Sequence, residues 1–399
     1  NQVMDYVLAD LDYAVANIGT QSNKTQFSKD MAQAFKLEVC LYEGAYAKYH
    51  QNDKARSDKF YGEAVKAGEA IATRYPINSS YASLYQSFRT AGGGFNGITN
   101  NSEIIFCKTY AEGVFMNSIS DYSNASDGVA GITKDAFDAF VFKDGLPASK
   151  TSYNKTDHGT VESETSISIA NLLDVRDQRL SVITYDHIFF PGLTWAASNT
   201  VGQWSSTGYG VAKFNNLTVP QAVVNEINNY LCAPLFWGGR LYVGILEAKA
   251  ELGTLTDADL AKYMKPLWNR AGIDTSKLTV AFLNGINDPK NKMGVSSLIY
   301  EIRRLRRCEL MLDDGIRYWD LVRWHQLDKL DFTTNPDIVK GAYIADAPAG
   351  ITAGKMTADG YYNCDWGQTR KFDKKYYFYP IPQNQLQLNE ALTQNDGWK

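Results

Sequence analysis

Residues 296–327 read SSLIYEIRRLRRCELMLDDGIRYWDLVRWHQL, and this stretch decides the fold class. Leu298, Ile302, Leu305 and Leu312 recur at spacings that place them on one side of a helix, while Gly315 interrupts the pattern. A second helix is predicted over residues 316–327. These two helices belong to a predicted architecture of helix pairs at both ends of the chain.

The charges of this stretch do not predict a nucleic-acid or phosphate site. Its arginines are matched by nearby acids, so a charged helix face with local ion pairs explains them better. The charged residues in question are Arg303, Arg304, Arg306 and Arg307, with Glu301, Glu309, Asp313 and Asp314.

Helical patterns also occupy the beginning of the chain. A helix is expected to start at Ser28, and a second is predicted over residues 57–75, where Pro76 stops it. Small residues such as Gly44 and Ala45 alternate with large rings such as Tyr42 and Tyr46, which is typical of helix pairs of the tetratricopeptide type. Helical periodicity returns over residues 240–252 and 257–271.

The remaining chain is rich in Gly, Asn, Ser and Asp. It carries one predicted strand at residues 103–110 and one helical stub at residues 133–142, and residues 111–235 otherwise read as mostly irregular. We therefore predict a mainly α fold, in which a tetratricopeptide-like scaffold of helix pairs carries a loop-rich, irregular ligand-binding part. The predicted organisation is one compact unit over 1–399, with the scaffold in 1–75 and 236–330 and the loop-rich part in 76–235 and 331–399.

Composition excludes several classes of protein. The 399 residues carry a net charge of −4 and 44% hydrophobic residues, which excludes intrinsic disorder and a polybasic nucleic-acid binder. The five cysteines and four histidines are scattered without metal-type spacing, and no catalytic motif occurs. Gly92, Gly94 and Gly97 match GxGxxG, but no strand precedes them and no helix follows. We expect no cofactor, no metal and no enzymatic activity.

Aromatic residues, which make up 13% of the chain, supply the candidate binding site. Flat rings stack on the faces of sugars, and polar neighbours bond the hydroxyl groups. The alternative is that these rings anchor long loops onto the scaffold. The candidate ligand-binding residues, chosen by their loop context, are Tyr81, Tyr85, Arg89, Phe95, Asn96, Trp195, Trp204 and Tyr209.

An ordered set of motifs resembles the SusD/RagB-like glycan-binding lipoproteins of Bacteroidetes. The chain departs from the family pattern at Leu305, where Glu is usual, and at Gln178, where Pro is frequent. The matching segments, in chain order, are Asn101–Phe106, Asp135–Phe137 with Asp144–Gly145, Val175–Leu180, Arg240–Leu252, Asn269–Gly272, Arg306–Leu310, Asp314–Trp324, and Tyr379–Pro382 with Asn389, Leu392, Gln394–Asn395 and Gly397–Trp398.

The resemblance implies a scaffold of four tetratricopeptide-like helix pairs in a protein on the outer face of the outer membrane. It further implies capture of an oligosaccharide or polysaccharide and delivery to a SusC-like TonB-dependent transporter, without chemistry. Arg317, Asp320 and Arg323 are then expected to clamp helices, and Pro380 and Pro382 to fix the path of the tail.

Membrane attachment rests on the resemblance, because the sequence shows no apolar run of membrane-spanning length and no lipid-attachment cysteine. The chain begins inside a helical pattern, which we interpret as a removed N-terminus that would carry the lipid anchor. Two other functions stay open: an interaction module that binds a peptide or another nutrient, and a glycan hydrolase with a dispersed site. The glycan and a role for calcium also stay open.

Overall fold

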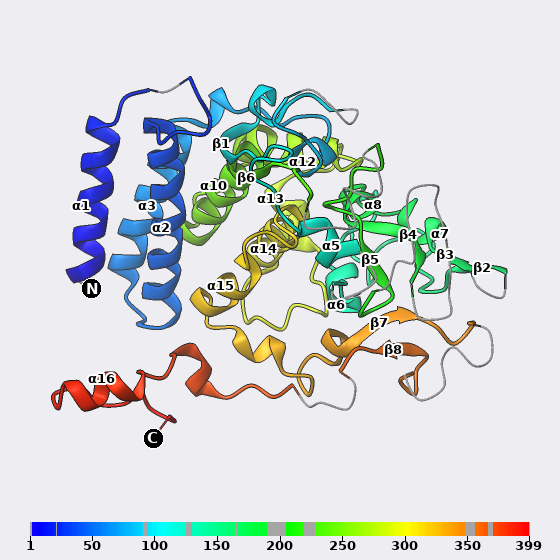
Figure 1. Ribbon diagram of the computed structural model, residues 1–399. Helices are drawn as coiled ribbons and strands as arrows, with labels where there is room; N and C mark the ends of the chain where they lie inside the picture. Colours follow the sequence, from blue (N-terminus) through cyan, green and yellow to red (C-terminus); the bar gives the residue numbers. More distant parts are fainter. Residues whose placement is uncertain are drawn as a thin grey trace.

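The structure, a computed structural model, describes residues 2–20, 22–90, 95–124, 130–163, 166–189, 205–218, 228–347, 356–365 and 370–398. Its first three helices lie side by side, and a short turn joins the second to the third (Figure 1). The side chain of Ser28 accepts a hydrogen bond from the backbone N–H of Met31, which caps the second helix at its predicted start. These helices are α1 (Gln2–Asn17), α2 (Lys29–Tyr49) and α3 (Lys54–Glu69).

The helices of the second half complete the scaffold by packing on the first three. Helix α10 contacts α2, α3 and α14, so segments about 200 residues apart in sequence share one set of helix contacts. Helix α15 packs on α2. These elements are α10 (Gly238–Leu252), α11 (Asp257–Asp259), a π-helical turn η3 (Leu260–Met264), α12 (Lys265–Arg270), α13 (Val280–Gly285), α14 (Ser297–Glu309) and α15 (Ile316–Arg323).

The two helices predicted at residues 296–327 are confirmed, although α14 and α15 both end earlier than expected. Leu312, Asp314 and Gly315 all have positive φ, at 67°, 44° and 64°. Such left-handed residues cannot continue an α-helix, so the chain turns between Glu309 and Ile316.

The loop-rich part contains more strand than predicted. The described residues between 111 and 235 are mostly irregular, as predicted, but they also form an unpredicted four-stranded antiparallel sheet in the order β2-β3-β4-β5. Two further antiparallel pairs are β1 with β6 and β7 with β8. The strands are β1 (Ile104–Lys108), β2 (Thr160–Ser163), β3 (Ser166–Ser168), β4 (Thr184–Ile188), β5 (Tyr209–Val211), β6 (Ala233–Trp237), β7 (Lys340–Tyr343) and β8 (Tyr361–Asn363).

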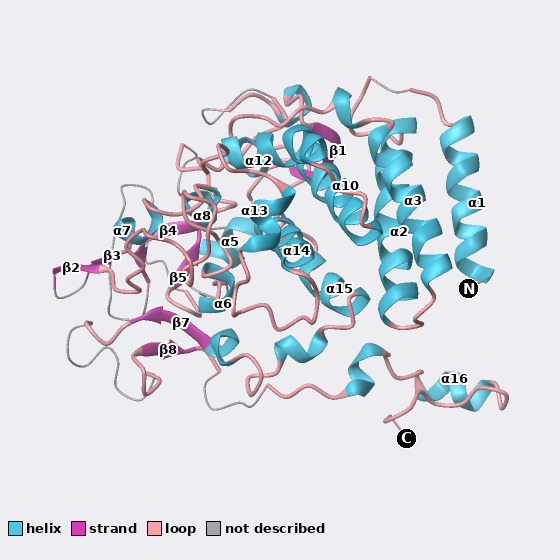
Figure 2. Ribbon diagram, turned by 180° about the vertical axis from the view of Figure 1, so that it is seen from behind, coloured by secondary structure: helices cyan, strands magenta, loops and turns pink. Residues whose placement is uncertain are grey.

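Short helical turns connect these strands and form the C-terminal tail. Figure 2 shows the tail running below the scaffold to α16. The short α-helices are α4 (Ala82–Tyr85), α5 (Ile119–Asn124), α6 (Lys134–Phe137), α7 (Ala170–Leu173), α8 (Arg179–Ile183) and α16 (Gln383–Leu388). The 3₁₀ turns are η1 (Ala72–Arg74), η2 (Ile98–Asn100), η4 (Leu327–Leu330), η5 (Pro336–Val339) and η6 (Lys374–Tyr377).

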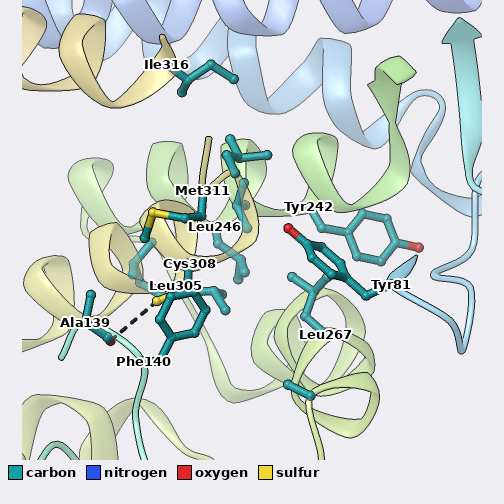
Figure 3. Packing of buried hydrophobic residues seen from close by; sticks show 14 of the residues in the cluster. Tyr81, Ala139, Phe140, Tyr242, Leu246, Leu267, Leu305, Cys308, Met311 and Ile316 are labelled. Carbon is teal, nitrogen blue, oxygen red and sulfur yellow. Dashed lines mark hydrogen bonds between the residues drawn. The ribbon is translucent and has the colours of Figure 1, made fainter. Parts of the chain in front are cut away.

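The main hydrophobic core is shared by the scaffold and the loop-rich part. Its buried residues extend from Leu8 in α1 to Tyr362 in β8. Figure 3 shows Phe140 of the loop-rich part beside Leu305 and Cys308 of α14, where the Cys308 thiol donates to the carbonyl oxygen of Ala139 at 3.4 Å. The single compact unit stays a prediction, and this shared core supports it.

Buried ion pairs join α15 to other scaffold helices. Two of the three residues predicted to clamp helices, Asp320 and Arg323, make such pairs. The Arg323 guanidinium donates to both carboxylate oxygens of Glu247 in α10, at 2.5 and 2.7 Å. Asp320 accepts from Arg306 of α14 at 2.9 Å. Arg317 differs, since the described residues provide it with no ion pair or hydrogen bond.

Candidate functional site

Three parts of the described chain lie together beside the β1/β6 pair: residues 86–90 with 95–100, residues 108–117 and residues 228–232. The backbones of Asn117 and Asn229 exchange two hydrogen bonds, at 2.7 and 3.0 Å. The N–H of Cys232 donates to the carbonyl oxygen of Ser87 at 3.0 Å. We call this region the loop surface and define it by Arg89, Phe95, Asn96, Lys108, Tyr110, Phe115 and Tyr230.

Two stacked rings form the most exposed aromatic part of the loop surface. The rings of Tyr110 and Phe115 are nearly parallel, with centroids 5.0 Å apart. They flank a tight turn in which Gly113 has φ +67°, and the N–H of Ala111 donates to the carbonyl oxygen of Phe115 at 2.9 Å. Phe115 is 51% exposed, so this ring offers apolar surface to a ligand.

Charged and polar groups surround these rings. The Lys108 ammonium lies 4.7 Å from the centroid of Phe115 and 5.2 Å from that of Tyr110, within the range of a cation–π contact. Phe88 packs against Tyr230, with centroids 4.9 Å apart. Burial, with the nearby charge of Glu112, raises the pKa of Tyr230, so its phenol stays a neutral donor at physiological pH.

Three of the sequence-predicted residues belong to the loop surface. Arg89 and Asn96 are exposed, and Phe95 is half-buried. Rings with cationic and amide neighbours can stack on apolar ligand faces and bond to hydroxyl groups. This arrangement suits the binding of a ligand that has both apolar faces and hydroxyl groups.

Three other predicted residues belong to the core, and their expected role as ligand platforms is corrected. Tyr81 is 4% exposed, and its hydroxyl donates to the carbonyl oxygen of Glu309 at 2.7 Å. Figure 3 shows Tyr81 beside Tyr242 and Leu267. Although Tyr81 borders a polar cavity of about 420 Å³, a ring so buried offers no face for stacking.

Tyr85 and Tyr209 have the same packing role. Tyr85 is 2% exposed and donates to a carboxylate oxygen of Asp313 at 2.9 Å. Tyr209 is 3% exposed and stacks on Phe137, with centroids 4.5 Å apart. The anchoring alternative for loop aromatics thus holds at these positions.

The last two predicted residues, Trp195 and Trp204, lie outside the described residues. Their ligand role stays a prediction. Sequence reasoning missed Lys108, Tyr110, Phe115 and Tyr230 as members of the loop surface. The signal was present in residues 108–115, KTYAEGVF, where two rings flank a glycine-containing turn directly after a predicted strand.

A separate hollow lies between α15 and the tail. It has a volume of about 250 Å³ and is lined mainly by rings, among them Tyr318, Phe372, Phe378 and Trp398. The Trp398 indole N–H donates to the carbonyl oxygen of Phe378 at 2.8 Å, which ties the end of the tail to this place. This hollow between α15 and the tail, which we call the tail hollow, is aromatic like the loop surface but has few polar groups. Its rings can therefore serve as controls for the rings of the loop surface.

The described ranges contain neither a cluster of metal-ligand side chains nor a membrane-spanning helix. Across these ranges, no three His, Cys, Asp or Glu side chains gather in a way that could hold a metal ion. The same part of the chain contains no helix that is both long and apolar enough to cross a bilayer.

The fold and the loop surface define a mainly α-helical class of protein, in which helix pairs support a loop-rich face. The SusD family model matches residues 89–398, and the chain belongs to the SusD family. This membership agrees with the motifs at residues 306–324 and 379–398, which lie within the matched range.

Solved structures of the same fold extend the comparison over nearly the whole chain. A SusD-like carbohydrate binding protein from Bacteroides fragilis is 20% identical, with a TM-score of 0.68 over 98% of this chain and 71% of that one. A protein solved with xylogluco-oligosaccharide is 16% identical, with a TM-score of 0.56 over 97% and 71% of the two chains. Surface glycan-binding protein A from Bacteroides thetaiotaomicron is also 16% identical, with a TM-score of 0.50 over 99% and 70%. No curated protein matches the sequence.

Proposed function

We propose that this protein binds an oligosaccharide or polysaccharide at the cell surface and delivers it to a TonB-dependent transporter. Family membership supports the carbohydrate class, since similar structures include a carbohydrate binding protein and a surface glycan-binding protein. Attachment to the outer membrane through an N-terminal lipid, and a SusC-like partner, are parts of this proposal that rest on the family resemblance.

The observation that carries the proposal is the half-exposed Phe115 ring, backed by Tyr110 and flanked by Lys108. Packing against a second ring holds Phe115 in place, so less conformational entropy is lost when a sugar ring stacks on it. Arg89 and Asn96 then supply hydrogen bonds to hydroxyl groups. The mechanism is capture and release, and no bond of the glycan is broken.

A titration against plant, host-mucin and microbial oligosaccharides tests the proposal. We expect saturable binding to at least one glycan without product formation, measured by calorimetry and by chromatography of the ligand. Phe115→Ala should weaken that binding about tenfold, on the order of 1.4 kcal/mol. Phe378→Ala is the matched control, because Phe378 is equally exposed, at 51%, but lies on the tail.

Each other outcome points to a different function. Cleaved products would establish a hydrolase, and binding of peptides in place of glycans would favour the interaction module. Weakening by F378A and not by F115A would move the site to the tail hollow. Trp195→Ala and Trp204→Ala, measured in the same titration, decide whether either predicted tryptophan belongs to the site.

A further inference from the structure

A second cavity, which shares no residue with the loop surface, has an unusual balance of charge. It lies between α14, α15, α6 and the segment of residues 289–293, and its volume is about 210 Å³. That is several times the ~30 Å³ that one water molecule occupies in the liquid. Among the described residues, seven cationic side chains line it and only three carboxylates do.

Three of the cations are neutralised from outside the cavity. Arg303 pairs with Glu251 at 2.8 Å, and Lys329 pairs with Asp328 at 2.5 Å. Arg304 pairs with Asp288 and Glu301, neither of which lines the cavity. When these three cations are set aside, four cations and three carboxylates remain among the lining residues.

Two more cations, with Lys134 and Lys340 from outside the cavity, pair with all three lining carboxylates. Lys290 pairs with Asp138 at 3.0 Å and with Asp337 at 3.3 Å. Arg307 pairs with Asp135 at 2.5 Å. Arg317 and Lys292 remain, and the described part of the chain gives their side chains no ion pair.

Arg317 is the lining cation whose surroundings most clearly favour an anion. It belongs to the family motif at residues 314–324, where the sequence predicts that it clamps helices. Its guanidinium is held next to Arg307, a like charge whose own Nε is buried without a hydrogen-bond partner. Desolvation and the charge of Arg307 lower the pKa of Arg317 to about 9, although Asp135 and Asp320 act in the opposite direction. The side chain is therefore a cation in a site that disfavours cations.

The geometry points to a ligand that would correct this imbalance: we propose that the cavity binds a small oxyanion group, a carboxylate, sulfate or phosphate, between Arg317 and Lys292. A planar guanidinium matches such a group through two parallel N–H donors, and a lysine adds a point charge. The group can belong to a free inorganic ion or to an acidic sugar, and the experiment distinguishes the two sources.

The test compares thermal unfolding and calorimetric titration of the wild type with those of Arg317→Met. The probes are sodium sulfate, sodium phosphate, glucuronate and neutral glucose, each at ionic strength matched with sodium chloride. We expect an oxyanion, but not glucose, to raise the melting temperature of the wild type. R317M should weaken binding at least tenfold, and without ligand it should be at least as stable as the wild type, because it loses no partner.

Two further variants separate the binding role from a structural one. Lys292→Met should also weaken binding, and it stays informative if R317M does not fold. Arg370→Met is the control, because Arg370 is 53% exposed on the tail and should leave binding unchanged. Response to sulfate or phosphate alone identifies a free ion as the ligand, whereas response to glucuronate alone identifies an acidic sugar.

The proposal is overturned by either of two results. One is the absence of any stabilisation beyond the effect of ionic strength. The other is stabilisation that R317M and K292M both retain in full. Binding of neutral glycans at the loop surface should be unaffected by R317M, so failure of this inference and failure of the proposed function are distinguishable.

Discussion

Identical side chains in one short segment have opposite electrostatic environments. Arg323 meets both oxygens of Glu247 and also contacts Asp320, whereas Arg317, two helical turns earlier, faces Arg307. A buried cation with carboxylate partners on two helices holds those helices together, and a cation without them costs stability. The sequence motif predicts that these residues are important, but it does not separate a structural arginine from one available to a ligand.

Glu301 in α14 allows a test of such costs at a single residue. It is 4% exposed, and burial together with Asp288 raises its pKa to about 7, although Arg304 lowers it. Between about pH 4.5 and 7, the folded state keeps a proton that the unfolded state has released. The free energy of unfolding should therefore fall as pH rises through this window, by up to about 3 kcal/mol.

Glu301→Gln should remove that contribution, because Gln stays neutral and still accepts a hydrogen bond from Arg304. We expect urea denaturation to show the variant close to the wild type at pH 5 and more stable than it at pH 8. Glu390→Gln, on the exposed tail, controls for loss of a charge. A stability difference between E301Q and the wild type that is constant from pH 5 to pH 8 would contradict the assignment.

At the scale of elements, the long helices were predictable and the short strands were not. Periodic apolar positions and the Ser28 cap predicted α2, and the same reasoning found α10 and α14. The β2–β5 sheet was missed because its strands have three to five residues, too few for an alternating pattern to stand out. Pairing such as Thr184 with Val211 depends on contacts that only the folded chain makes.

The predicted site residues were also only partly placed correctly by the sequence. Loop context selected Arg89, Phe95 and Asn96, which lie on the loop surface, but it also selected Tyr81 and Tyr85, which are buried. A loop ring is buried or exposed according to what packs over it, and in this case α12, α14 and β6 supply the cover. Local composition carries no information about such distant partners, so exposure had to come from the structure.

Close helix packing at a glycine yields a prediction at the same scale. A Cβ atom at Gly68 in α3 would lie 2.5 Å from Ile245 of α10 and 2.6 Å from Leu37 of α2. Gly68→Ala should therefore overpack this junction and lower the free energy of unfolding by about 1–3 kcal/mol. The matched control is Gly62→Ala in the same helix, where no atom lies within 4 Å of the new Cβ.

The two substitutions should have opposite signs in chemical denaturation. G62A removes the conformational cost of a helical glycine and should stabilise the protein by roughly 0.5–1 kcal/mol. If G68A were equally stabilising, α2, α3 and α10 would not meet as closely as the structure shows. A destabilising G68A with a stabilising G62A would locate the tight contact at the junction.

At the scale of the whole molecule, a buried charge network ties the loop-rich part to the scaffold. Arg179, directly after the loop segment 174–178, pairs with Asp177 and reaches Glu309 of α14 at 2.8 Å. Glu309 also accepts from Arg270 of α12, which in turn binds Glu103 beside β1. The network thus connects segments from residue 103 to residue 309, and two of its ion pairs, Arg179–Glu309 and Arg270–Glu103, join the loop-rich part to the scaffold.

Arg179→Met tests whether this coupling makes the chain one cooperative unit. The substitution leaves Asp177 without its guanidinium and removes one of two cations from Glu309, and breaking a buried pair costs about 3–5 kcal/mol. If the parts unfold together, calorimetry should show one transition in the wild type and one, at lower temperature, in R179M. Arg370→Met should melt like the wild type. Two separable transitions, of which R179M shifts only one, would show instead that the loop-rich part and the scaffold unfold independently, because destabilising a shared unit must move the whole transition.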